Sequence, residues 1–197
     1  MDSCAAREWT LTEAARLLGE PQHRLIYLCE KGVVQPDFED AKGRGSSRRF
    51  SAQNLLEFAI ALRLRVLEIP ALSIGAITYT LRAFEHKVQQ QIPDFCLPYG
   101  LRGAGAPDLR VLLKEGRLYL TLGTGKNAPK VYGGVDLKKL GREKSKKSAG
   151  DLQRALVLRT PSGRKTRHGM NGELGESSVA RVEMSITRIA QELRLEV

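Results

Sequence analysis

The chain has 197 residues, which suffices for one ordinary domain or two small ones. Hydrophobic residues make up 42% of it, so a wholly disordered chain is excluded, and no stretch approaches the roughly 18 apolar residues of a membrane-spanning helix. The first nine residues are mixed and charged, which predicts no secretory signal, no membrane partner and a cytoplasmic protein. The distant cysteines Cys4, Cys29 and Cys96 predict reduced thiols rather than a disulfide scaffold or a zinc knuckle.

The chain is strongly basic, with 32 Lys and Arg against 22 acids and a net charge of +10. Such a balance favours a polyanionic partner, either nucleic acid or an anionic membrane surface. The excess is uneven, because residues 1–92 hold 12 basic and 11 acidic side chains whereas residues 93–197 hold 20 and 11. The charge therefore indicates that the chain binds a polyanion, but it does not show which part of the chain makes the specific contacts.

Two short helices are predicted near the start of the chain. Thr12 can cap a helix over residues 13–18 that stops at Gly19, and a second helix over residues 22–31 ends at Gly32. Their apolar residues recur at helical spacing and can share one small core. Because the loop between them is short, the pair must cross sharply, which is typical of a helix-turn-helix.

A polar, glycine-containing run over residues 37–47 follows, and it closes with Arg48, Arg49 and Phe50. Two short extended pieces joined by a basic tip would form a hairpin, or wing. Ser51 is a suitable N-cap for a third helix, which continues to Pro70.

Ser73 is predicted to cap a fourth helix that runs to about Gln91. Its apolar residues form a seam with spacings of 3 and 4, as in a coiled coil: Ile74, Ile77, Leu81, Phe84 and Val88. The seam can pair two copies of the chain, or it can pack against the chain's own domain. The narrow seam favours dimerisation.

The second half is different in character. Residues 109–114 and 117–122 flank Glu115-Gly116 as a strand hairpin, residues 131–132 and 179–184 predict further strands, and a helix over residues 186–195 closes the chain. The predicted class is therefore α+β, with a winged helix-turn-helix DNA-binding domain over residues 1–70, a dimerisation helix over 71–92 and a small basic α+β module over 93–197.

The first half resembles the MerR family of winged helix-turn-helix regulators. The resemblance rests on residues 9–19, 25–27 and 30–36, on the wing end at residues 46–51, and on the position of the seam helix. The chain departs from the family pattern at three positions, where Ile26 replaces an arginine and Leu28 and Ser47 replace tyrosines. The resemblance implies a homodimer that binds a pseudo-palindromic promoter site, bends and untwists the promoter DNA, and contacts RNA polymerase.

Double-stranded DNA is thus the expected partner. The recognition helix reads base edges in the major groove, where arginine pairs with guanine and glutamine with adenine, while wing groups hold phosphates. Arg24 and Gln22 are the expected base readers. The full set of predicted DNA-binding residues is Gln22, His23, Arg24, Tyr27, Arg44, Arg48 and Arg49.

The residues suggest no catalytic constellation, no metal site and no cofactor. His23, His86 and His168 have no partner serine or cysteine at a recognisable spacing, so the sequence predicts no enzyme. An architectural or excisionase-like protein that bends DNA for recombination is the alternative to a transcriptional regulator. For the basic second half, extra backbone contacts, signal reception and partner contacts all stay open.

Overall fold

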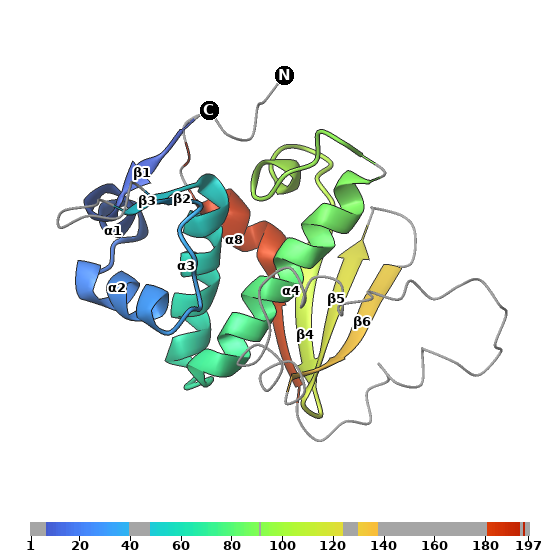
Figure 1. Ribbon diagram of the computed structural model, residues 1–197. Helices are drawn as coiled ribbons and strands as arrows, with labels where there is room; N and C mark the ends of the chain where they lie inside the picture. The colour runs from blue at the N-terminus through green and yellow to red at the C-terminus, as the bar shows by residue number, and fades with distance from the viewer. Residues whose placement is uncertain are drawn as a thin grey trace, which may run out of the picture. The chain divides into compact units, whose positions relative to one another are not determined.

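A computed structural model of the chain describes residues 7–39, 48–90, 92–123, 130–137, 181–193 and 195. It confirms the α+β class, with helices and two small antiparallel sheets (Figure 1). The chain forms two compact units, Met1–Ala106 with Thr187–Val197, and Pro107–Ile186. The first unit thus extends beyond the expected boundary after residue 92 and includes most of the closing helix.

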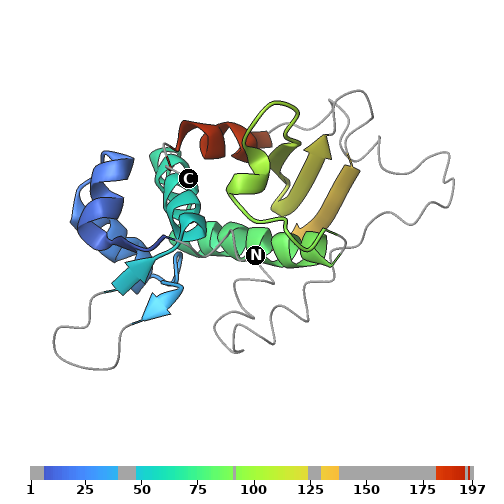
Figure 2. The ribbon, with the colours of Figure 1, turned by 90° about the horizontal axis from the view of Figure 1, so that it is seen from above.

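The first unit holds a three-stranded sheet and most of the helices. In Figure 2, helices α1 and α2 lie on one side of α3, and the strands of the sheet run beside them. The sheet order is β1-β3-β2, with Trp9 opposite Phe50 and Phe38 opposite Arg49. In chain order, the elements are β1 (Trp9–Thr10), α1 (Leu11–Leu18), α2 (Gln22–Glu30), β2 (Phe38–Glu39), β3 (Arg48–Phe50), α3 (Ala52–Val66), α4 (Ala71–Gln89), the 3-10 turn η1 (Tyr99–Leu101) and α8 (Ile186–Glu192).

Aromatic side chains anchor the core of this unit. Phe50 and Phe58 are fully buried, and their rings meet edge-on at 5.2 Å. Trp9, the cross-strand partner of Phe50, is also buried, and Leu25 and Leu28 bury one side of α2. This core fixes α2 against α3 and leaves the other side of α2 in solvent.

Helix α1 begins earlier than expected, and its cap is Thr10 rather than Thr12. The Glu13 backbone N–H donates to the Thr10 hydroxyl at 3.3 Å, and the Thr10 backbone N–H donates to the Glu13 carboxylate at 2.8 Å. This reciprocal pair is a capping box. The backbone hydrogen bond from Thr10 lowers the pKa of Glu13. At the other end, Gly19 adopts φ 65°, which ends the helix where the sequence predicts.

We expect Thr10→Ala to lower the free energy of unfolding by about 1 kcal/mol, because it removes the N-cap of α1. Thr12→Ala is the matched control, since the Thr12 hydroxyl accepts an exposed hydrogen bond from Gln22 and does not cap α1. Urea unfolding of both variants measures the difference. A larger loss from Thr12→Ala than from Thr10→Ala would contradict this assignment.

Helix α3 confirms its predicted start, because the Ser51 hydroxyl accepts from the Asn54 backbone N–H at 3.1 Å. Helix α4 does not begin as expected. Pro70 is its N-cap and Ala71 its first residue, so Ser73 lies inside the first turn. The fixed φ of proline suits entry into a helix, and it sets this earlier start.

A buried carboxylate on α4 holds the chain that follows the helix. Glu85 is 7% exposed and accepts a hydrogen bond from the Leu97 backbone N–H at 2.7 Å. Burial raises the pKa of Glu85 to about 7, although the Leu97 N–H and the Arg82 charge act in the opposite direction. The protonated form is therefore favoured in the folded chain below neutral pH.

This shift predicts a pH dependence of stability. Because the folded pKa of Glu85 lies above the unfolded value, its contribution is fully present below about pH 4.5 and is lost as pH rises through about 7, by at most about 3 kcal/mol. Glu85→Gln keeps an acceptor for the Leu97 N–H and removes the ionisation. We expect this variant to match the wild type at pH 5 and to unfold at a higher temperature at pH 8. An unchanged pH profile in calorimetry would refute the assignment.

The second unit is an antiparallel sheet of order β6-β5-β4-β7. Its predicted hairpin is confirmed, because Asp108 pairs with Gly123 and Lys114 with Arg117 along the whole length. Glu115 and Gly116 both have positive φ, as a two-residue hairpin turn requires. The strands are β4 (Asp108–Lys114), β5 (Arg117–Gly123), β6 (Lys130–Asp136) and β7 (Arg181–Ser185).

Two sequence expectations concern thiols and membranes. Cys96 is disulfide-bonded, which corrects the expectation of reduced cysteines, whereas Cys29 is a free thiol. In the described part of the chain, no helix is long and apolar enough to cross a membrane.

Candidate nucleic-acid interface

Helix α2 presents a polar face to solvent. Leu25 and Leu28 are buried at a spacing of three residues, which puts both on the core side of the helix and leaves its other side in solvent. Four of the predicted DNA-binding residues are exposed on this helix, and together they form what we term the α2 face: Gln22, His23, Arg24 and Tyr27. All four side chains are exposed, but residues two apart on a helix do not face each other, so Gln22 lies toward α1 and Arg24 toward α3.

Weak local contacts hold these side chains. Arg24 is 59% exposed and pairs with Glu20 one turn earlier, at 2.9 Å. The Gln22 amide donates to the Thr12 hydroxyl at 3.2 Å, and the Lys31 ammonium lies 5.7 Å from the centre of the Tyr27 ring. Exposed pairs of this kind contribute at most about 1 kcal/mol. A stronger partner for Arg24 can therefore displace Glu20 at little cost.

Strand β3 brings two further predicted residues to this region. Arg48 is exposed and lies near enough to the Cys29 thiol on α2 for its charge to lower the pKa of that thiol, and Arg49 pairs with Glu8 at 3.6 Å. Burial raises the pKa of Cys29 to about 11, more than the Arg48 charge lowers it, so this thiol is protonated at neutral pH. The proximity of Arg48 to Cys29 places the start of β3 beside α2. Arg44 lies outside the described residues.

A buried ion pair fixes the chain that leads into β2. Glu57 on α3 is 2% exposed, and both Nε and Nη2 of Arg82 on α4 donate to its carboxylate, the latter at 2.9 Å. Arg82 also donates to Asp37 at 2.7 Å and to the Gln35 carbonyl at 3.3 Å. Three segments distant in sequence are thereby tied together just before β2.

Asn54 completes this arrangement from the first turn of α3. Its amide nitrogen donates to the Gln35 carbonyl at 2.8 Å, and its amide oxygen accepts from the Asp37 and Ser51 backbone N–H groups. Burial raises the pKa of Glu57, and the hydrogen bonds from Arg82 oppose this shift. We refer to Asp37, Asn54, Glu57 and Arg82 as the buried polar cluster, after its two buried members, Asn54 and Glu57; Arg82 is partly exposed and Asp37 reaches solvent. It anchors the β2–β3 region to α3 and α4.

The predicted dimerisation seam lies largely inside the chain. Ile74, Ile77 and Phe84 are fully buried, Leu81 is 2% exposed, and Val88 is partly exposed. The spacing of 3 and 4 thus belongs to a core helix in this structure, and the seam is not an open surface. A homodimer stays a prediction, and it would have to pair through other residues.

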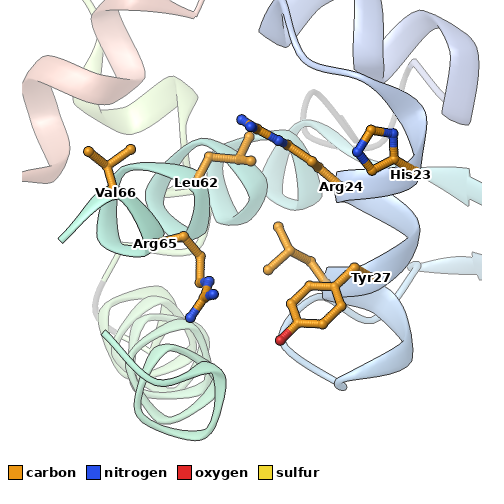
Figure 3. A pocket seen from close by; sticks show the side chains of 7 residues that line it. His23, Arg24, Tyr27, Leu62, Arg65 and Val66 are labelled. Carbon is orange, nitrogen blue, oxygen red and sulfur yellow. The ribbon is translucent and has the colours of Figure 1, made fainter. Parts of the chain in front are cut away.

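Sequence reasoning missed a cavity beside the α2 face. It has a volume of about 430 Å³ and lies between α2 and the last turns of α3 (Figure 3). Arg65 and Val66 contribute to it from α3, opposite Tyr27 and Arg24. Arg65 stands 41 positions after Arg24, and no local sequence pattern links the two.

No protein-family model matches the chain, and no curated protein sequence is significantly similar to it. The basic runs between residues 138 and 168 lie outside the described residues.

Proposed function

We propose that the chain is a sequence-specific DNA-binding regulator of transcription whose first unit is a winged helix-turn-helix. One observation carries the proposal: the α2 face is exposed, holds Arg24 and Gln22, and lies beside Arg48 of β3. In such a module, α2 would be the recognition helix in the major groove. The β2–β3 hairpin would be the wing that holds the backbone.

The chemistry of each side chain indicates whether it would contact bases or phosphates. Arg24 can pair bidentately with guanine O6 and N7, and Gln22 with adenine N6 and N7. Arg48 and Arg49 would bind phosphates and set the register of α2. The buried polar cluster supports this geometry, because it holds the chain before β2 on α3 and α4. The net charge of +10 favours the same partner.

The resemblance to MerR regulators adds a homodimer, a promoter site and contact with RNA polymerase to the proposal. A second candidate, an architectural or excisionase-like DNA-bending protein, is favoured by one observation. The seam of α4 is buried in the chain's own core, so the surface through which the regulator was expected to dimerise is not open.

A genome-wide binding map of the intact protein, combined with transcript levels in a deletion strain, tests the proposal. Sharp peaks over promoters whose transcripts change would support the regulator. Peaks confined to recombination sites would support the architectural candidate. Analytical ultracentrifugation of the free protein and of its DNA complex adds the oligomeric state, for which the regulator predicts a dimer on DNA.

A further inference from the structure

The cavity between α2 and α3 is lined partly by polar and partly by apolar side chains. The side chains on its walls are His23, Arg24, Tyr27, Leu28, Leu62, Arg65 and Val66 (Figure 3). Three of them carry nitrogen groups that can donate hydrogen bonds, three are aliphatic, one is a tyrosine, and none is a carboxylate. All seven belong to the first compact unit. A volume of about 430 Å³ falls within the range of small-molecule sites.

Two of the lining side chains, Val66 and Tyr27, are unusually open to water. Val66 is 81% exposed and Tyr27 38% exposed, although both are large apolar side chains. Covering such side chains stabilises a complex by roughly 25 cal/mol per Å² of apolar surface removed from water. An occupant with an apolar group would therefore gain from the α3 side of the cavity.

The polar part is suited to an anion. Arg65 is exposed, and within the described part of the chain its guanidinium makes one hydrogen bond, to the Ile69 carbonyl at 3.2 Å. A guanidinium has five N–H donors in a fork that fits a carboxylate. Arg24, on the α2 wall of the cavity, already pairs with the Glu20 carboxylate at 2.9 Å, so Arg65 is the guanidinium to which we assign the carboxylate of an occupant.

We propose that this cavity binds a small amphipathic carboxylate, an aromatic or branched-chain acid, with Arg65 as the carboxylate partner and Leu62 and Val66 against its apolar group. A DNA phosphate fits the basic groups equally well, but it has no apolar group to cover the aliphatic side chains. The two halves of the lining together therefore favour an amphipathic acid over a phosphate.

Occupancy of the cavity would affect DNA binding, and this step rests on the proposed function. His23, Arg24 and Tyr27 belong both to the cavity lining and to the α2 face. A carboxylate and DNA would then compete for the same side chains, and each would weaken the other reciprocally. At a carboxylate concentration ten times its dissociation constant, the apparent Kd for DNA rises about tenfold.

The first test uses the full chain without DNA. Indole-3-acetate and 4-phenylbutyrate are titrated by calorimetry, with their primary amides and inorganic phosphate as comparisons. We expect both carboxylates to saturate at one site and to bind at least tenfold more tightly than the amides. Amides that bind as well as the acids, phosphate that binds as tightly as the acids, or acids that fail to saturate at 10 mM would each overturn the proposal.

Variants locate the site. Arg65→Met is expected to weaken carboxylate binding at least tenfold, and Val66→Trp to abolish it by filling the cavity. Arg63→Met is the matched control on the same helix, because Arg63 pairs with Glu192 and does not line the cavity. Val66 is exposed, so its variant is expected to fold and keeps the test valid if Arg65→Met does not. Equal binding by Val66→Trp and Arg63→Met would overturn the proposal.

Measuring DNA affinity with and without the carboxylate distinguishes the cavity proposal from the proposed function. Carboxylate binding without any DNA affinity would leave the cavity site standing and overturn the proposed function. DNA binding that the carboxylate does not weaken, although it occupies the site, would overturn the coupling.

Discussion

Replacing Arg82 with methionine is expected to lower the free energy of unfolding by about 3 kcal/mol at pH 7.5, because it leaves Glu57 buried without its cationic partner. The same substitution removes the donor to Asp37 and loosens the chain before β2. Protonation of the unpaired Glu57 carboxylate would recover part of the lost stability. The folded pKa of Glu57 then lies further above the unfolded value than in the wild type.

The pH dependence of this loss follows from the sign of that shift. A raised folded pKa means that the folded state of the variant binds more protons, so its stability falls as pH rises above about 4.5. The cost of Arg82→Met should therefore be smaller at pH 5 than at pH 7.5. Urea unfolding at both values measures it.

Two controls define the effect. The double variant Glu57→Gln with Arg82→Met removes the stranded charge, and we expect it to recover most of the loss. Arg63→Met breaks the exposed pair with Glu192 at 2.6 Å and should cost less than about 1 kcal/mol. If Arg82→Met costs no more than Arg63→Met, the buried polar cluster does not stabilise the fold as we describe.

The second large effect is expected on the affinity for DNA. Arg24→Ala should weaken binding to a selected duplex by about 1 to 3 kcal/mol, roughly 5- to 150-fold, and should relax the preference at one base pair. Losing the ion pair with Glu20 should change the stability of the fold only slightly, because that pair is exposed. Fluorescence anisotropy with the selected duplex and single-base variants measures both quantities.

Arg48→Ala should behave differently, because a phosphate contact carries no base information. We expect it to weaken binding to all duplexes alike and to reduce the log–log salt slope by about 0.9. Arg188→Ala on α8 is the control and should change neither quantity, because Arg188 is an exposed partner of Glu192 outside both the α2 face and β3. Identical results for Arg24→Ala and Arg188→Ala would contradict the role given to the α2 face.

The sequence predicts much of the local structure because its signals are local. Gly32 marks the end of α2, Ser51 caps α3, and Glu115-Gly116 closes the β4–β5 hairpin as expected. The start of α1 was mispredicted although its signal was present, since Glu13 three residues after Thr10 forms a capping box.

The features that depend on distant residues could not be predicted. A spacing of 3 and 4 on α4 is common to a dimer seam and to a core helix, and only the packing of the whole chain buries Ile77 and Phe84. Glu57 and Arg82 are 25 positions apart, and nothing local marks them as partners. The cavity arises in the same way, because α2 and α3 each contribute only part of its lining.

The central claim is that the α2 face reads DNA sequence, and selection from a random duplex library tests it most directly. The intact chain and Arg24→Ala are taken through the same rounds, and the bound duplexes are sequenced. We predict that the intact chain enriches a defined motif and that Arg24→Ala loses the preference at one base pair of it. Enrichment of no motif, or of the same motif by both proteins, would contradict the account.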